Sequence, residues 1–502
     1  MRSRKRAVEK ELRGANNLRV VSLFFLFRKG IALQNRGFFG RRVLCADPIA
    51  LTAENVGKIM QELLPVHKDN AKEIRQLKEF YKGNQPIIDR RKEVRPEITN
   101  IVVENRAFEI VEFKKGYEFS HPVQYTNAGK NMETEVDTLN MFARVDGKEA
   151  KDLSLAEDFY ISGNAYKITL PKQNVTEDDA PYFTDVLPPE TTFVVYSNAV
   201  GRPALFAGTY VIKSDGLGKE LHHCGIYTDA KYFEWKSTGK IDFSKTPVEK
   251  PNGMKAIPIV EYILNESRMG YVEICYHLFN AINTVNSNRL DGIEQFVQAL
   301  LVFINCQLQE DENGNKRVPR TGDAIEVGNG QGNADVKFLT SQLDQSQVQV
   351  TKDDLLRSAY EIAGVPDRQN RNQGGGDTGQ AVVLRNGWGA AEARAMSTEK
   401  PFRRSEMEYL KLVLSICRTA GEIKVLNLKE IDIKFTRNRS DNMLVKAQAL
   451  QIMQKCGVPK DVAYEVCELF SDPAAVWEKA EKYSNLVDAP SEGEKLGDQV
   501  EI

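Results

Sequence analysis

The fold is decided by YVEICYHLFNAINTVNSNRLDGIEQFVQALLVFI at residues 271–304, a stretch nearly free of Pro and turn clusters. Apolar residues recur along it at spacings of three to five, which is typical of an amphipathic α-helix. At about 1.5 Å per residue, a helix over the whole stretch would be a rod of roughly 50 Å. The apolar end at residues 300–304 also fits a strand. The apolar face of a helix of that length needs another element packed along it.

A second helical stretch follows at residues 351–363, after short strand candidates at residues 324–327 and 336–339. The strand candidates stand among Gly- and Asn-rich turns. The sequence therefore predicts two helices that flank a β insert of about 45 residues.

A polar loop comes next, because no apolar side chain occurs between Pro366 and Ala381. Its glycines and polar side chains predict a mobile, inserted loop. The loop leads into a second long helical run at residues 380–420. Gly387, Gly389 and Pro401 mark the positions in this run where a kink is expected.

The part of the chain before residue 271 begins with helices and continues with strands. Helical spacing predicts two helices within residues 51–82, separated at Pro65. The same spacing recurs from Ile98 and predicts a helix that ends at Gly116. Alternating and aromatic runs predict a β-rich region over about residues 158–262.

The end of the chain contains a strand candidate at residues 431–435, then amphipathic helices at residues 443–455 and 460–470, then a polar tail. Together these patterns predict an α+β fold that is mainly helical. The length of 502 residues suggests about three domains or one large elongated subunit.

The composition is that of an ordinary folded chain, with 41% hydrophobic, 27% charged and 9% aromatic residues. No stretch approaches the roughly 18 consecutive apolar residues of a membrane span, so no membrane partner is expected. The seven cysteines are scattered and odd in number. They indicate a reducing compartment and neither a disulfide framework nor a zinc ribbon.

The net charge of −2 conceals a basic N-terminus. Residues 1–50 hold twelve Lys or Arg against three acids, which leaves 56 basic and 67 acidic residues in the rest. We expect residues 1–50 to be a basic, disordered extension, with a nucleic-acid-binding arm or a targeting segment as the alternatives. The mildly acidic remainder argues against tight binding of phosphates by the body.

Enzyme signatures are weak throughout. Gly374, Gly375 and Gly376 precede a helix, but Gln380 and Ala381 stand where a nucleotide-binding loop needs Lys and a hydroxyl residue. His222 and Cys224 would share one face of a strand, and two ligands do not make a metal site. A hydrogen-bonded strand histidine is the favoured interpretation. No Gly-x-Ser-x-Gly sequence occurs.

A metal-dependent, DNA-processing nuclease is the alternative of a different class. Asp432 and Glu422 each stand two residues before a lysine, as acids do on some nuclease strands. If this alternative held, Asp432→Ala or Glu422→Ala would abolish a metal-dependent activity, and we expect no such activity. We therefore assign no catalytic, cofactor-binding or metal-binding residue, and a structural or assembly role remains.

Several segments, in order, resemble the portal, or head-to-tail connector, proteins of tailed bacteriophages, particularly those of long-tailed phages of Bacillus. The resemblance rests on EFYKGNQPI (79–87), NIVVEN (100–105), GYEFSHPVQY (116–125), GVPD (364–367), DTGQAVVL (377–384), IDIKFTRN (431–438) and DP (472–473). It covers about residues 51–482. Ser120 stands before His121 and Pro122 where the family is expected to favour glycine before proline.

The resemblance implies a portal fold with wing, stem, clip, tunnel loop and helical crown. The expected parts are a wing (51–269), a first stem helix (270–298), a clip (299–345), a second stem helix (346–363), a tunnel loop (364–379), a long kinked wing helix (380–420) and a crown with C-terminal tail (421–502). The extension at residues 1–50 has no counterpart in this plan.

The resemblance also implies a function without catalysis or cofactors. Such subunits form a ring, usually of twelve copies, at one capsid vertex of the virion, after assembly in the cytoplasm of the host bacterium. Double-stranded DNA passes through the channel during packaging and ejection. The implied protein partners are the terminase large subunit, a head completion or tail adaptor protein, and the major capsid and scaffold proteins.

The tunnel loop is the expected DNA-proximal element. Its residues are Arg368, Gln369, Asn370, Arg371, Asn372, Gln373, Gly374, Gly375 and Gly376. Two arginines can form only a few ion pairs with DNA phosphates, which suits a channel through which DNA must slide. The alternative is that the segment is a linker without a DNA contact.

Overall fold

The computed structural model describes residues 40–128, 132–214, 219–297, 300–304, 335–339, 345–366, 387–437, 443–467 and 476–477. Within these ranges the largest sheet has six strands, in the order β1-β5-β6-β7-β8-β9. Their bounds are Leu44–Ala46, Thr192–Ser197, Ala204–Ser214, Glu220–Tyr227, Lys231–Thr238 and Val248–Pro251. β1 is parallel to β5, and the other neighbours are antiparallel.

The six-stranded sheet lies between a helix and a second sheet. Phe193 and Val195 of β5 join the core beneath helix α3 (Val56–Tyr81), and Val194 between them joins the core toward the second sheet. Because successive side chains of a strand point to opposite faces, a strand covered on both faces is apolar throughout. The second sheet has the order β10-β3-β4, with bounds Ile259–Ile263, Asn164–Pro171 and Tyr182–Leu187.

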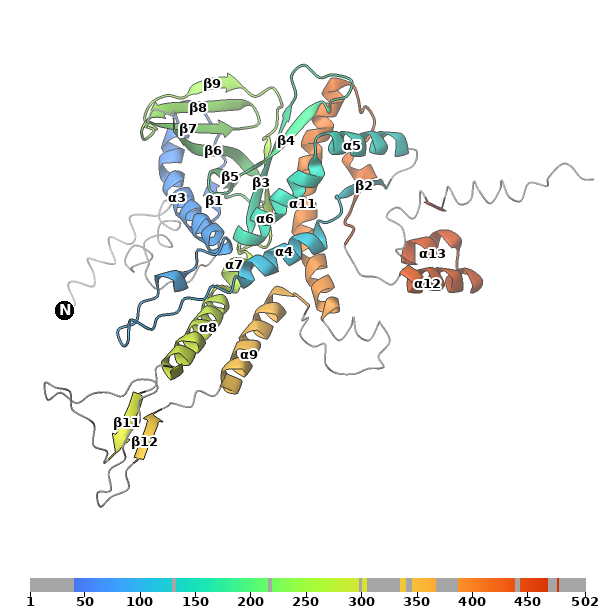
Figure 1. Cartoon of the computed structure of the whole chain (residues 1–502). Helices are drawn as coiled ribbons and strands as arrows, with labels where there is room; N and C mark the ends of the chain where they lie inside the picture. The colour runs from blue at the N-terminus through green and yellow to red at the C-terminus, as the bar shows by residue number, and fades with distance from the viewer. Residues whose placement is uncertain are drawn as a thin grey trace, which may run out of the picture. The chain divides into compact units, whose positions relative to one another are not determined.

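Two helices pack on this second sheet (Figure 1). α6 (Lys148–Ser162) contacts β3, and α11 (Trp388–Ala420) contacts both β10 and β3. Around them lie α4 (Arg106–Glu118), α5 (Glu133–Val145) and β2 (Gln124–Asn127). β2 forms an antiparallel pair with β13 (Ile431–Lys434), so the strand predicted near residue 431 is confirmed.

Helices α8 (Tyr276–Val297) and α9 (Gln345–Ala363) lie side by side (Figure 1). The single turn α7 (Tyr271–Ile274) precedes α8. Between the two long helices, β11 (Leu300–Ile304) pairs with β12 (Asp335–Leu339) in an antiparallel ladder. The strand alternative for residues 300–304 and the strand predicted at residues 336–339 are thus confirmed. The candidate at residues 324–327 lies outside the described residues.

The last helices are α12 (Met443–Lys455) and α13 (Lys460–Cys467), close to the two predicted at the end of the chain. Short 3-10 turns occur at η2 (Pro86–Asp89) and η3 (Leu428–Glu430). Among the described residues, we find no helix with the length and hydropathy that a bilayer span requires.

Prolines interrupt the helices less than the sequence predicts. α3 continues through Pro65, although a break was expected there. A proline inside a helix costs about 3 kcal/mol. Pro65 is exposed, and Met60 and Ile74 on either side are buried, so the packing of both halves offsets that cost. α11 begins at Trp388, after Gly387, and runs through Gly389 and Pro401 to Ala420, so the kink expected at these positions stays a prediction. Residues 380–386 of the predicted helical run lie outside the described residues.

The helix predicted from Ile98 to Gly116 is displaced along the chain. α4 begins only at Arg106, and the side chain of Asn105 caps it by accepting a hydrogen bond from the N–H of Phe108 at 3.2 Å. Gly116 lies inside α4 and does not end it. Residues 98–105 have no helical turn, because their backbone groups bond to another helix, as described below.

The boundary of the N-terminal extension at residue 50 is wrong. β1 pairs with β5, and Leu44 belongs to the core beneath α3. Arg41 is only 4% exposed, and its guanidinium pairs with Glu273 at 2.9 Å and with Glu73 at 3.0 Å. Its charge is therefore neutralised inside the protein and is not available to a nucleic acid. Residues 40–46 belong to the body.

Candidate functional site

The predicted site residues, 368–376, lie outside the described residues. The structure describes both roots of the loop that contains them, namely residues 364–366 on one side and Gly387 with Trp388 on the other. The geometry of these roots determines where the loop leaves the body and where it returns.

The first root is a left-handed turn at the end of α9. Gly364 has φ +66°, and its N–H donates to the carbonyl of Glu361 at 3.2 Å. A Cβ at this glycine would lie 2.6 Å from Cγ of Arg394 on α11. Both the positive φ and the close side chain therefore favour glycine here. Pro366, the last described residue before the loop, is buried.

The second root lies against the first. Gly387 has φ +82°, and a Cβ placed on it would be 3.8 Å from Cα of Pro366. Trp388 follows and packs against two stacked rings of α4, with centroid distances of 6.0 Å to Phe113 and 5.8 Å to Tyr117. The chain therefore leaves and re-enters the body at one place, as closed surface loops do.

A buried arginine holds the beginning of α11. Arg437, three residues after β13, donates from Nη1 to Glu392 Oε1 at 2.6 Å and pairs through Nη2 with Glu399. Tyr117 of α4 donates to the other oxygen of Glu392 at 2.7 Å. Burial raises the pKa of Glu399 to about 7, against the lowering effect of Arg437. The sequence did not single out Arg437, because its partners lie 38 and 45 residues away and no local pattern marks the pairing.

Helix α8 binds an extended segment, residues 100–104, through its polar face. Asn283, Ser287 and Asp291, spaced four residues apart, accept from the backbone N–H groups of Glu104, Val102 and Asn100 at 2.8, 3.0 and 2.7 Å. Four helical residues advance about 6 Å and two extended residues advance nearly 7 Å, so the two spacings match. This ladder explains why residues 98–105 are not helical.

Some large apolar residues of α8, and one of the neighbouring α9, are exposed. Leu290 and Ile293 of α8 are 43% and 46% exposed, and Val350 of α9 is 60% exposed. The first half of α8 buries Phe279 and Ile282, but its second half buries Ser287 and Asp291 and leaves Leu290 and Ile293 exposed. Burial in this second half is the reverse of that in an ordinary surface helix, and an exposed apolar face of this kind indicates an interaction surface.

Four buried charged side chains form a paired cluster. Lys148, Asp152, Lys167 and Glu406 come from α6, β3 and α11, and each is at most 5% exposed. Tyr125 and Tyr262 donate to the two oxygens of Glu406 at 2.7 and 2.5 Å. Burial alone would raise the pKa of Glu406, but Lys148 and Lys167 hold it below its ordinary value. The cluster joins five elements and has the features of a structural network.

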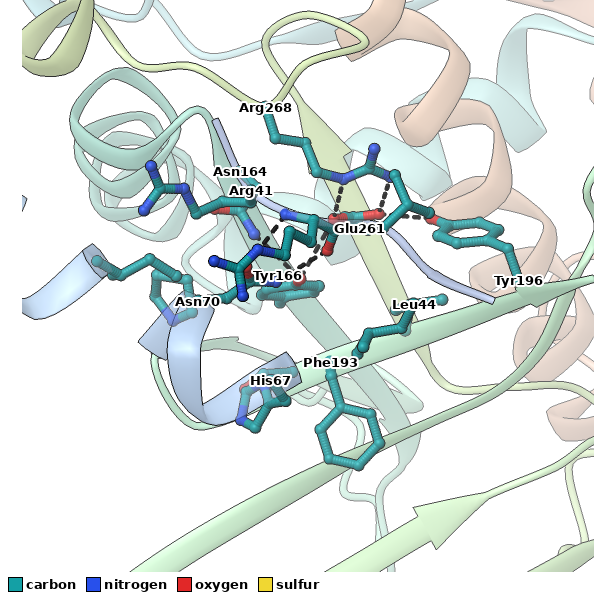
Figure 2. Close-up of a pocket in the computed structure, with 16 residues that line it drawn as sticks. Arg41, Leu44, His67, Asn70, Asn164, Tyr166, Phe193, Tyr196, Glu261 and Arg268 are labelled. Atoms are coloured by element: carbon teal, nitrogen blue, oxygen red, sulfur yellow. Dashed lines mark hydrogen bonds and ion pairs between the residues drawn. The ribbon is translucent and has the colours of Figure 1, made fainter. Parts of the chain in front are cut away.

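A small cavity lies beneath β1 (Figure 2). Its volume is about 10 Å³, roughly the space of a single water molecule. Arg268 pairs with Glu261 at 2.8 and 2.9 Å, and Tyr196 donates to Glu261 at 2.7 Å. Figure 2 shows these three side chains turned toward one another. The cavity is too small to be a substrate pocket.

The other residues singled out from the sequence are dispersed. Nδ1 of His222 and Oη of Tyr210 lie 2.8 Å apart and share a hydrogen bond, and Asp432 pairs with Arg403 at an exposed position. In the ranges that the structure describes, no three His, Cys, Asp or Glu side chains gather as metal ligands.

Comparison with known proteins identifies the class. The family model "Phage portal protein, SPP1 Gp6-like" matches residues 61–485, from within α3 to beyond α13, and the chain belongs to this family. The portal resemblance of the sequence is confirmed, as is the α+β fold class.

Among individual proteins, the portal protein of Bacillus phage SPP1 is 24% identical over 271 residues. That alignment covers 51% of this chain and 52% of the relative, so the match spans about half the relative's length. A solved structure, the neck of an empty GTA particle computed with C6 symmetry, is similar with a TM-score of 0.40 and 13% identity, over 71% of this chain and 88% of that one.

Proposed function

We propose that this chain is the subunit of a ring at one capsid vertex of a tailed phage, and that double-stranded DNA passes through the ring during packaging and ejection. The observation that carries the proposal is the family match over residues 61–485. The ring number implied by the family is usually twelve. The proposal includes no catalytic step and no cofactor.

The exposed face of α8 supports assembly into a ring. Its polar side chains are already satisfied by residues 100–104 of the same subunit, so its open aliphatic residues are the part that needs a partner. In a ring, each subunit presents one surface to the next subunit and a different surface to the previous one. The face of α8 with Leu290 and Ile293 is then one side of that contact.

The loop with residues 368–376 is the proposed DNA-proximal element. The two roots lie next to each other, so the loop begins and ends at one point of the body, and this supports the proposal. Arg368 and Arg371 are its only charges in this range, which limits the phosphates it holds and lets a duplex move past.

Residues 299–345, with the β11–β12 pair, are the proposed docking platform for the terminase large subunit and for a head completion or tail adaptor protein. The major capsid and scaffold proteins are the further proposed partners. Assembly takes place in the cytoplasm of the host bacterium, and the finished ring lies at the capsid vertex of the virion.

Electron microscopy of the purified chain, with light scattering for mass, tests the proposal first. The expected result is a ring of about twelve copies of the 56.6 kDa subunit, with a channel of roughly 20 Å or more, the width of a DNA duplex. A chain that stays monomeric even when co-expressed with its scaffold and capsid proteins contradicts the proposal.

Deletion of Gly374, Gly375 and Gly376 tests the role of the loop. Rings should form as in the wild type, and DNA packaging should fall sharply. A matched deletion of three residues in the polar tail, 491–493, should leave both properties intact. If the loop variant fails to fold, or packages normally, the DNA-proximal assignment is wrong.

A further inference from the structure

One face of α4 contacts both helices that carry the loop roots. Its residues Arg106, Glu109, Phe113 and Tyr117 follow one another at spacings of three and four, so they lie in one stripe along the helix. The first two contact the end of α9, and the last two contact the beginning of α11. α4 therefore touches each helix next to the place where the loop starts or ends.

Tyr360 joins α4 to the first root. Its hydroxyl donates to Glu109 Oε2 at 2.9 Å and accepts from Nη1 of Arg106 at 3.1 Å. The residue is buried, with 6% of its surface exposed. The carbonyl of Tyr360 accepts from the N–H of Val365 at 2.8 Å, in the turn that contains Gly364. Tyr360 thus bonds to α4 through its side chain and to the root through its backbone.

Tyr117 joins α4 to the second root. Its hydroxyl donates to Glu392 Oε2 of α11 at 2.7 Å. Its ring packs against Trp388, the first residue of α11, which directly follows Gly387. Tyr117 is buried as well, so water cannot readily replace these contacts. A phenol group therefore stands between α4 and each of the two roots.

Apolar packing also holds these helix ends, but it is less directional. Four buried alanines lie there, Ala359 and Ala363 of α9 and Ala391 and Ala395 of α11. The hydrophobic effect has no preferred direction, and the short side chain of alanine offers little to interlock. A hydrogen bond has a preferred length and angle. The hydroxyl groups of the two tyrosines therefore select one position for each helix end.

We propose that Tyr117 and Tyr360 are positioning residues for the DNA-proximal loop, whose two roots they fix to one stripe of α4. The inference rests on the proposed function, which assigns this loop to the DNA. α4 is itself tied to α8, because the segment at residues 100–104, which α8 binds, leads directly into α4 at Asn105. The tyrosines thereby set the place of both roots relative to the helix that is proposed to contact the next subunit.

Substitution of each tyrosine by phenylalanine removes one hydroxyl group and keeps the ring. The ion pairs around both hydroxyl groups remain, because Glu109 keeps Arg106 and Glu392 keeps Arg437. A change in the variants therefore reports on the hydrogen bonds and not on an uncompensated charge.

Hydrogen exchange of the full-length rings, followed by mass spectrometry, tests each tyrosine separately. Tyr360→Phe should raise exchange about tenfold in peptides covering residues 361–365. Tyr117→Phe should raise exchange by a similar factor in peptides covering residues 388–395. Each substitution should act mainly on its own root, because each hydroxyl bonds to a different helix.

Tyr81→Phe is the matched control. The hydroxyl of Tyr81 donates to Glu112 of α4 at 2.7 Å, and Glu112 lies on a different face of this helix from the stripe. The control therefore loses the same kind of hydrogen bond to α4, away from both roots. Its exchange at residues 361–365 and 388–395 should stay within twofold of the wild type.

DNA packaging separates positioning from a merely structural role. The double variant Tyr117→Phe with Tyr360→Phe should form rings as the wild type does and package less than half as much DNA, whereas Tyr81→Phe should package normally. The inference is overturned if root exchange stays within twofold of the wild type, if the double variant forms no rings, or if it alone packages normally. Normal packaging by both the double variant and the Gly374–Gly376 deletion, with faster exchange at the roots, would instead contradict the proposed function of the loop.

Discussion

Lys167 is a buried cation that pairs with two carboxylates in the interior of the protein. Its ammonium group lies 2.8 Å from Asp152 and 3.6 Å from Glu406, and it faces the rings of Tyr262 and Tyr409 at 5.0 and 4.6 Å. The side chain is completely buried, so water cannot compensate for a missing partner. Removing one member of such a group leaves an uncompensated buried charge.

Lys167→Met should therefore lower the free energy of unfolding by about 3–5 kcal/mol, measured by urea denaturation. Lys172→Met is the matched control. Lys172 follows the same strand and pairs with Asp179 while 39% exposed, so its loss should cost less than about 1 kcal/mol. Equal effects of the two substitutions would contradict the structural role of the buried network.

His67 makes stability depend on pH. Burial, with smaller contributions from Arg75 and Lys68, lowers the pKa of His67 from 6.5 to about 4. The unfolded chain therefore takes up a proton between pH 6.5 and 4 that the folded chain does not. The stabilising contribution is present above pH 6.5 and is lost as the pH falls toward 4.

His67→Phe should remove this dependence while keeping a ring near Phe193, which His67 contacts at a centroid distance of 5.0 Å. Between pH 7 and 4.5 the wild type should lose about 2 kcal/mol more stability than the variant. The measurement is a pair of urea unfolding curves for each protein. Equal losses of stability in both proteins would show that the pKa of His67 is the same in the folded and the unfolded chain.

At the scale of elements, α8 binds residues 100–104 by side chains that bond to backbone. An extended segment normally satisfies its backbone in a sheet, but here the helix supplies the acceptors. The pattern of apolar residues at 98–113 cannot reveal this, because Ile101, Val102 and Val103 fit a helix and an extended segment equally well.

Ser287→Ala tests these hydrogen bonds between α8 side chains and the backbone of residues 100–104. The N–H of Val102 loses its acceptor at 3.0 Å, so stability should fall by about 1 kcal/mol and exchange of the Val102 amide should rise. Thr284→Ala is the control, because the Thr284 hydroxyl bonds only to the Asn280 carbonyl of its own helix and is exposed. Hydrogen exchange of peptides covering residues 98–106 distinguishes the two. Unchanged exchange in Ser287→Ala would contradict the ladder.

At the scale of the whole molecule, the open face of α8 determines how subunits associate in the proposed ring. Burying one Leu or Ile side chain contributes about 1.5–3 kcal/mol, and every contact in the ring repeats that contribution. Leu290→Asp with Ile293→Asp should therefore shift the protein from rings to smaller species in light scattering, with helix content unchanged. Val200→Asp, at a fully exposed turn, is the control and should assemble normally. Intact rings from the double variant would place the contact elsewhere.

The sequence by itself determined the local elements with strong periods. The spacing of apolar residues over short stretches of sequence predicts these elements, which are the helices α8, α9 and α12 and the strands β12 and β13. The family could be identified because short motifs occur in a fixed order over most of the chain. Gly364 marked the expected start of the polar loop, but Gly387 was expected to be a kink inside a helical run from residue 380, and the structure instead places it directly before α11.

Only the tertiary structure decided the partners of the charged and polar residues. Arg41 looked like part of a basic tail, and its carboxylate partner Glu273 lies 232 residues away. Ser287 reaches Val102 across 185 residues, and Lys167 reaches Glu406 only because β3 and α11 pack together. Hydrogen bonds and ion pairs act over a few ångströms. A sequence shows which residues can form them, and the packing of distant elements selects which residues meet.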